Sequence, residues 1–211
     1  MSDSPPPLTL AEEDLARAHC YALISRLFYA PPDAKLLESI GAAGSATEAS
    51  APDETSTSGA YTEAFIALQR ACRAADLAAL RQEYDDIFVG AGKALVTPYT
   101  SGYSLRNAPD RHLVALREQL STWGLARRDA VFEVEDHVSG ICDAMRWLIV
   151  GGHALEVQRA FFEEYVYTGV GPFCDAVDAH ASATSFYRAA AALSRAFLRV
   201  EQEGFALLAS E

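Results

Sequence analysis

The sequence has few cysteines and no long apolar run, and both shortages restrict what the chain can be. Its four cysteines are widely spaced, and none belongs to a CxxC pair. Zinc and iron–sulfur sites need clustered ligands, so we expect neither a metal nor a cofactor. No stretch reaches the roughly 18 consecutive apolar residues that a membrane span requires. Each cysteine has apolar or helical neighbours, where a thiol usually behaves as a small buried apolar side chain. Cysteines of this kind favour a cytoplasmic protein.

Basic residues are also scarce, because 17 Lys and Arg stand against 29 Asp and Glu, for a formal net charge of −12. Such a surface repels a phosphate backbone, so nucleic acid is not an expected partner. The same negative charge favours a basic partner, such as a peptide with arginines. The alternative interpretation is that the charge serves only to keep the protein soluble. The first residues are polar and proline-rich, without the basic region of a secretory signal. We therefore expect a cytoplasmic protein with a disordered N-terminus at residues 1–8.

Motifs that carry catalytic chemistry are missing as well. The sequence has no Gly-x-Ser-x-Gly elbow. The segment 90–93 departs from a nucleotide-binding loop, because Ile87 replaces a required Gly and Ala94 a required Ser or Thr. A di-iron bundle needs two Glu-x-x-His pairs, which are not present. We expect no catalytic residue and no enzyme; a helical metal-dependent hydrolase that uses the carboxylate clusters is one alternative.

Helical periodicity extends through most of the chain, and no alternating run of β-branched residues predicts a strand. The first helix is predicted to start at a capping box of Thr9 and Glu12 and to end before Pro31. Its predicted buried stripe comprises Leu15, Cys20, Leu23, Leu27 and Phe28. Further helices are predicted at 33–40, 61–74, 76–88, 110–123, 133–150, 153–167, 173–181 and 185–208. The expected fold class is all-α, a single helical-bundle domain over residues 9–211.

Two segments interrupt the helical pattern. Residues 41–60 are rich in Gly, Ala, Ser, Thr and acidic residues and have no large apolar side chain. Such a segment cannot bury enough surface to offset its ordering entropy, so we predict a mobile linker there. Residues 89–109 contain several Gly and Pro but keep apolar and aromatic residues such as Val96 and Tyr99. Long loops of this kind are usually functional or disordered, and the apolar residues favour an ordered, functional loop.

Two residue clusters can be read either as ordinary packing or as a binding surface. Tyr84, Ile87 and Phe88 share one helical face, which is typical of a helix end packed on a core. Residues 133–137 place three carboxylates and a histidine at a predicted helix start, where acidic residues oppose the positive end of the helix dipole. Taken singly, each cluster is typical of ordinary packing.

The order of these segments resembles the TorD/DmsD group of redox enzyme maturation chaperones. Its aromatic-x-x-Leu-Phe motif is matched by Tyr84-Asp85-Asp86-Ile87-Phe88, with Ile for Leu. Its Pro-aromatic-x-Ser-x-Tyr stretch is matched by Pro98-Tyr99-Thr100-Ser101-Gly102-Tyr103. Its Glu-Pro-x-Asp-His motif is matched by Glu133-Val134-Glu135-Asp136-His137, without the proline. A later family segment is matched poorly, because Tyr165 and Gly169 replace a His and a Trp.

The resemblance implies a cytoplasmic chaperone that binds the twin-arginine signal peptide of a molybdenum-containing oxidoreductase precursor. Such a chaperone assists cofactor insertion before export, and the molybdopterin belongs to the client. The resemblance also implies a homodimer formed by exchange of helical segments. A second interpretation is a maturation factor for a cytoplasm-facing, nitrate-reductase-like enzyme, without leader recognition.

A groove for the signal peptide is a further implication of the resemblance, and the residue chemistry suits such a ligand. Aromatic side chains would take the apolar segment of the peptide, because they give large contact area at low entropic cost. Carboxylates would face the two arginines, and His137 would orient Asp136 or contact the peptide. The predicted peptide-binding residues are Tyr84, Ile87, Phe88, Pro98, Tyr99, Ser101, Tyr103, Glu133, Asp136 and His137.

Overall fold

The computed structural model describes residues 10–43, 56–90, 92–103, 109–125, 135–182 and 185–208, and this part of the chain is all-α. It contains no strand, and an isolated antiparallel bridge joins Tyr99 to His137. The predicted fold class is therefore confirmed. The α-helices are α1 (Glu12–Tyr29), α2 (Ala34–Ala42), α3 (Thr57–Ala74), α4 (Leu77–Tyr84), α5 (Pro109–Thr122), α6 (Val138–Val150), α7 (Leu155–Phe161), α8 (Thr168–His180) and α9 (Phe186–Leu208). Short segments η1 (Asp85–Val89) and η3 (Phe162–Tyr167) are π-helical, and η2 (Thr100–Tyr103) is a 3₁₀-helix.

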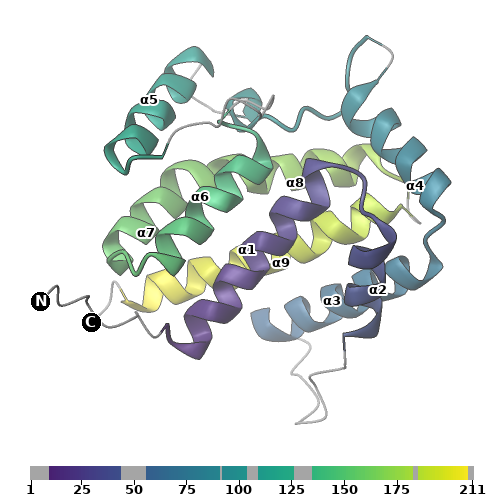
Figure 1. The fold of residues 1–211 in the computed structure, drawn as a ribbon, viewed down its shortest axis with the longest axis horizontal. Helices are drawn as coiled ribbons and strands as arrows, with labels where there is room; N and C mark the ends of the chain where they lie inside the picture. The colour runs from purple at the N-terminus through teal and green to yellow at the C-terminus, as the bar shows by residue number, and fades with distance from the viewer. Residues whose placement is uncertain are drawn as a thin grey trace, which may run out of the picture.

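The first and last helices form the centre of the bundle (Figure 1). Helix α1 packs along α6, and α9 packs along α3 and α8. Helix α2 lies against α3, and α5 stands to one side of the bundle, where its main contact is with η2. Elements from both ends of the sequence therefore enclose one core.

An aromatic cluster occupies the middle of this core. The ring centroids of Phe28 and Phe173 are 4.9 Å apart, in an edge-to-face arrangement. Phe88 lies 5.9 Å from Phe173 and 5.1 Å from Tyr187. Offset and edge-to-face ring pairs contribute about 0.5–1.5 kcal/mol each beyond the burial of their area. These four rings come from α1, η1, α8 and α9, so the cluster connects helices that are far apart in the sequence.

Helix α1 begins later than the sequence pattern predicts. The residue before its first turn is Ala11, which supplies no side-chain cap, so the predicted capping box of Thr9 and Glu12 is wrong. The first turn carries Glu12, Glu13 and Asp14, whose charges stabilise the positive end of the helix dipole in place of a cap. The buried stripe is also shifted, because Leu15 is exposed while Tyr21 and Ile24 are buried.

Helices enter the predicted linker from both sides, so its bounds of 41–60 were too wide. Helix α2 continues to Ala42, and α3 starts at Thr57 after Ser56, whose side chain accepts from the Gly59 N–H. Side chains of α3 explain the extension of α2. Gln69 Nε2 donates to the carbonyl of Ile40 and Arg73 Nε to that of Gly41, two carbonyls in the last turn of α2. Residues 44–55 lie outside the described residues.

The two helices predicted at 153–167 and 173–181 are one continuous helical run. Helix α7 passes into the π-helical segment η3 and then into α8, so the predicted break at 168–172 is wrong. Pro172 lies inside α8, although proline cannot donate the i→i−4 hydrogen bond of a helix.

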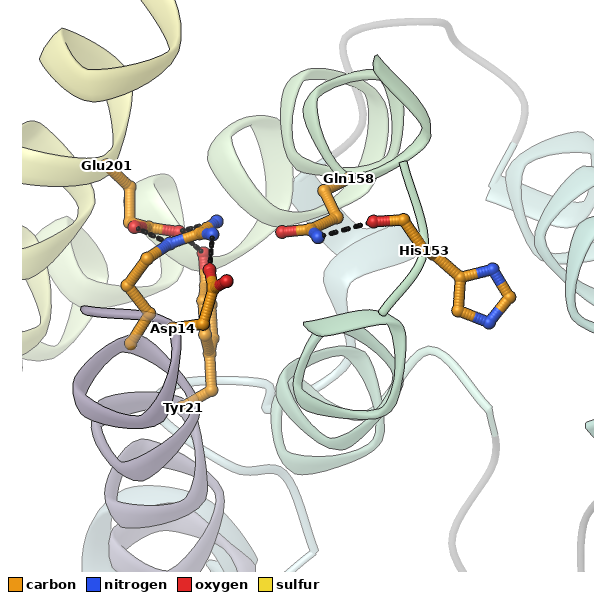
Figure 2. A network of polar contacts seen from close by, with 6 residues as sticks. Asp14, Tyr21, His153, Gln158 and Glu201 are labelled. Carbon is orange, nitrogen blue, oxygen red and sulfur yellow. Dashed lines mark hydrogen bonds and ion pairs between the residues drawn. The ribbon is translucent and has the colours of Figure 1, made fainter. Parts of the chain in front are cut away.

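A buried ion pair joins the two central helices. Arg17 of α1 binds Glu201 of α9 through two hydrogen bonds, with Nε–Oε1 2.7 Å and Nη2–Oε2 3.0 Å. The Tyr21 hydroxyl donates to the same carboxylate at 2.9 Å. Burial and then the charge of Glu201 raise the pKa of Tyr21 well above its usual value, so its hydroxyl remains a donor. Figure 2 shows Glu201 facing Tyr21 and Asp14 across the helix interface.

Removing one partner of this network should destabilise the fold strongly. For Glu201→Ala we expect a loss of about 3–5 kcal/mol in the free energy of unfolding, because Arg17 loses its more buried partner and Tyr21 its acceptor. Urea unfolding of wild type and variant measures the difference. Asp14→Ala is the matched control, because Asp14 contacts Arg17 from the more exposed edge and should cost less than about 1 kcal/mol. Equal losses in the two variants would contradict a central role for Glu201.

Candidate functional site

The predicted functional loop is ordered at residues 92–103 and is held by main-chain hydrogen bonds. The Val96 N–H donates to the Ile87 carbonyl at 2.9 Å, which attaches the loop to η1. The Thr100 N–H donates to the Asp136 carbonyl at 2.8 Å, and the Val138 N–H donates to the Pro98 carbonyl at 2.9 Å. The loop is thus paired with the segment before α6, and we call this pairing of residues 98–100 with 136–138 the loop clamp.

The clamp buries the acid–histidine pair that the sequence placed in the site. Asp136 and His137 are each 2% exposed. The Asp136 carboxylate accepts from the Ser101 N–H at 3.2 Å. His137 is the N-cap of α6, and its Nδ1 accepts from the Ser139 N–H at 3.2 Å. Both side chains therefore support the loop and the helix start, and a direct peptide contact stays a prediction.

The position of the clamp also corrects the predicted start of α6. The helix begins at Val138 and not at Glu133, because residues 136–138 are engaged in extended pairing with the loop. The acidic residues consequently precede the helix and do not occupy its first turn. Glu135 pairs with Arg117 of α5 at 2.9 Å, and Glu133 lies outside the described residues.

Most other predicted contact residues lie in the core or at its edge. Ile87 and Phe88 are buried, and the Tyr84 hydroxyl donates to the Tyr29 carbonyl at 3.0 Å. Pro98 is buried, whereas Ser101 is half-buried. Tyr99 is half-buried too, with its ring 5.5 Å from the His137 ring. In this conformation the first cluster follows the core-packing alternative, and its role in peptide binding stays a prediction.

Tyr103 is the predicted residue that lines a pocket. Its hydroxyl donates to the Thr97 carbonyl at 2.7 Å, and burial raises its pKa to about 12, which keeps the hydroxyl protonated. The pocket beside its ring has a volume of about 590 Å³, within the range of small-ligand sites. We call it the first pocket; it is lined by Tyr103, His112, Glu164, Tyr167, Thr168, Gly171, Pro172, Asp175, Arg195, Leu198 and Arg199.

The walls of the first pocket combine apolar area with charges of both signs. Tyr167 and Leu198 supply apolar surface, while Arg195 is paired with Asp175 at 3.1 Å. Such a pocket can hold an apolar side chain and orient its polar neighbours, which suits a peptide. Sequence reasoning did not find these residues, because the segment 165–173 was judged only by its poor match to a family motif. The signal that could have found them lies just before this segment, in residues 161–167, where aromatic residues flank two consecutive acidic ones.

Gly169 brings α8 close to the loop. A Cβ at this position would lie 2.6 Å from the Cβ of Thr100, which is fully buried in η2. Only glycine fits this contact without displacement of the loop. The absence of a side chain at Gly169 therefore allows η2 to lie directly against α8.

In the part of the chain that the structure describes, we find neither a cluster of metal ligands nor a membrane-spanning helix. The His, Cys, Asp and Glu residues of that part form no group of three that could hold a metal ion. All four cysteines are free, and burial raises the pKa of Cys174 to about 12. None of the described helices combines the length and apolar character that a membrane crossing needs.

Comparison with known proteins adds a family and a fold. A family model described as nitrate reductase delta subunit matches residues 54–175, more than half of the chain and the range that contains all three predicted motifs. The crystal structure of a proposed redox enzyme maturation protein from Archaeoglobus fulgidus has a TM-score of 0.52 to this chain. The match covers 94% of this chain and 99% of the Archaeoglobus chain. At 18% sequence identity, it shows a similarity of fold alone. None of the curated proteins compared with the chain matches it.

Two glycines of α8 provide a matched test of the contact with the loop. Gly169→Ala should lower the free energy of unfolding by about 1–3 kcal/mol, because its methyl group overlaps Thr100. Gly171→Ala should be neutral or stabilise by up to about 1 kcal/mol, because its Cβ meets nothing within 4 Å and Ala favours the helix. Thermal and urea unfolding of both variants measure the contrast. If Gly169→Ala were as stable as Gly171→Ala, the close approach of η2 to α8 would be refuted.

The clamp carboxylate should contribute to stability. Asp136→Ala removes the acceptor of the Ser101 N–H in a buried place, so we expect a loss of about 1–3 kcal/mol. Glu135→Ala, which breaks a more exposed ion pair with Arg117, should cost less than about 1 kcal/mol. Urea unfolding gives both values. A loss below that of Glu135→Ala would show that the carboxylate does not hold the loop.

Proposed function

The chain belongs to the nitrate reductase delta subunit family, and on this premise we propose that it is a cytoplasmic chaperone for a redox enzyme precursor. The client is a molybdenum-containing oxidoreductase, and the chaperone binds its twin-arginine leader until the cofactor is inserted. Binding the leader delays export, and the molybdenum cofactor belongs to the client. The resemblance to the TorD/DmsD group that the motifs predicted is confirmed by the family match, and the fold of the Archaeoglobus protein is consistent with it.

The observation that carries the proposal is the position of the first pocket beside the motif loop. Tyr103 ends the motif of residues 98–103 and also forms part of the pocket wall. The clamp and Gly169 fix that loop against α6 and α8, so the wall is rigid before a ligand arrives. A pre-organised apolar pocket loses less entropy on binding an extended peptide than a mobile surface does. The apolar segment of a leader is a ligand of the right chemistry for this pocket.

A second candidate function keeps the client class but removes leader recognition. The family description names a nitrate reductase, and an enzyme of that kind that stays on the cytoplasmic side needs no export signal. In that case the chaperone would bind the mature part of the client. The same pocket would then take an apolar segment of the folding enzyme.

A binding experiment with a client precursor separates the two functions. The purified chain is immobilised and exposed to the molybdoenzyme precursor encoded nearest to it in its genome, with and without the leader. Capture of the full precursor with loss of capture on leader removal supports leader recognition. Equal capture of both forms supports the second function, and capture of neither contradicts both for that client.

The first pocket makes a quantitative prediction. Tyr167→Ala should weaken binding of a synthetic twin-arginine leader peptide by about 1–3 kcal/mol, because Tyr167 is 41% exposed and its ring lines the pocket. Leu77→Ala is the control, since Leu77 is 47% exposed but lies on α4, outside the pocket lining. Calorimetric titration of folded variants measures the affinities. Identical affinities for Tyr167→Ala and wild type would place the apolar segment elsewhere.

A further inference from the structure

Two helix faces form opposite walls of the first pocket. Lining residues of α8 recur at the spacing i, i+3, i+4 and i+7, which places them on one face; they are Thr168, Gly171, Pro172 and Asp175. Lining residues of α9 have the same helical spacing and are Arg195, Leu198 and Arg199. Because α8 packs against α9, the shape of the pocket depends on the side chains of these two faces.

The α8 face lacks a side chain at Gly171. A Cβ at this position would meet nothing within 4 Å, so its direction leads into open space. Gly171 shares its helix face with Thr168 and Asp175, which also line the pocket, so this open space belongs to the pocket. The pocket is therefore hollowed at the place where the α8 face has no side chain.

No positive φ and no tertiary contact requires glycine at position 171. Its backbone is helical, and it is not among the glycines with a positive φ. Gly169 differs in this respect, because a Cβ there would lie 2.6 Å from the Cβ of Thr100. Glycine destabilises a helix interior relative to alanine. A residue that weakens its own helix without a packing reason is typical of a functional position.

The first pocket extends from the surface to the core. Tyr167 is 41% exposed, whereas Leu198 is 2% exposed and belongs to the core cluster. The wall at Tyr103 is fixed, because its hydroxyl donates to the Thr97 carbonyl and its ring lies 6.3 Å from that of Phe173. A deep pocket with fixed walls suits a bulky apolar side chain. A small side chain leaves the walls without contacting atoms and loses their dispersion energy.

We propose that Gly171 sets the depth of the first pocket and thereby selects client segments with bulky apolar side chains over segments of small ones. This inference rests on the proposed function for the source of the segment, which is the apolar part of the leader. The arginine pair is common to twin-arginine leaders, so it cannot distinguish one client from another. The size of the apolar side chains can make that distinction, and Gly171 is the residue that makes the pocket sensitive to it.

Filling the hollow tests the role of Gly171. Gly171→Leu should weaken binding of a leader peptide with Leu and Phe in its apolar segment by at least roughly ten-fold, because its side chain occupies the space of the ligand. Gly204→Leu is the matched control, since Gly204 is also helical and its Cβ would meet nothing within 4 Å, but it lies on α9 outside the lining. The control should change the affinity by less than about two-fold. Calorimetric titration measures both affinities.

The size preference has its own readout. The second probe is the same leader peptide with each Leu and Phe changed to Ala, and the third is the apolar dye anilinonaphthalene sulfonate, which contains no leader sequence. Wild type should bind the bulky peptide at least roughly ten-fold more tightly than the Ala peptide. Gly171→Leu should lose most of this preference, whereas Gly204→Leu should keep it.

The neighbouring Pro172 predicts a different pattern if Gly171 has only a local role. A Cβ before a proline disfavours the helical conformation, so substitutions of Gly171 would then lower the melting temperature. The affinity of the folded protein would stay unchanged, and that result would overturn the inference. Should Gly171→Leu fail to fold, Gly171→Ala replaces it. An Ala variant with the affinity and the size preference of wild type then also overturns the inference.

The three probes separate this inference from the proposed function. If folded Gly171→Leu binds the bulky peptide as tightly as wild type does, the inference is overturned and leader binding stands. If no peptide binds, but the dye binds wild type and Gly204→Leu and not Gly171→Leu, the role of Gly171 in the pocket stands and leader binding is overturned. Without peptide binding, equal dye binding by the two variants overturns both, and so does the absence of dye binding.

Discussion

The loop clamp is the interaction on which the arrangement of the first pocket depends. A loop of a dozen residues inside a helical protein leaves many main-chain groups that need partners, because unpaired buried N–H and carbonyl groups are costly. The pairing of residues 98–100 with 136–138 supplies those partners, and the Asp136 carboxylate adds one more at Ser101. The same hydrogen bonds fix the start of α6 and the position of η2. Tyr103 reaches the wall of the first pocket only because η2 is held there.

Helix content and most helix bounds were predictable from the sequence, because they depend on local patterns. The helices at 61–74 and 110–123 were recognised from apolar periodicity, and Pro31 and Pro32 did mark the end of α1. The start of α6 was not predictable in the same way, because it is set by pairing with a loop that lies more than thirty residues earlier. The extension of α2 likewise depends on Gln69 and Arg73 of another helix. Tertiary contacts of this kind leave no periodic signal.

Several predicted site residues lie close together in the structure, but their exposure to solvent could not be read from their order in the sequence. Phe88 and Tyr103 both lie near Phe173, and Tyr99 contacts His137, so the structure does bring the motif segments together. Several of these residues are buried, however, and act as the scaffold behind a pocket. The pocket itself is lined largely by α8 and α9, whose contribution depends on how the bundle closes. A motif identifies residues that a family needs, and burial decides whether such a residue holds the site or contacts the ligand.

The charges in the lining of the first pocket balance one another. The lining contains two acidic residues and two arginines, and Arg195 is paired with Asp175 at 3.1 Å. Partly exposed ion pairs of this kind add little net attraction or repulsion toward a charged ligand. Tyr167 and Leu198 supply apolar surface in the same lining. The pocket therefore selects a ligand by shape and apolar contact, and net charge contributes little to that selection.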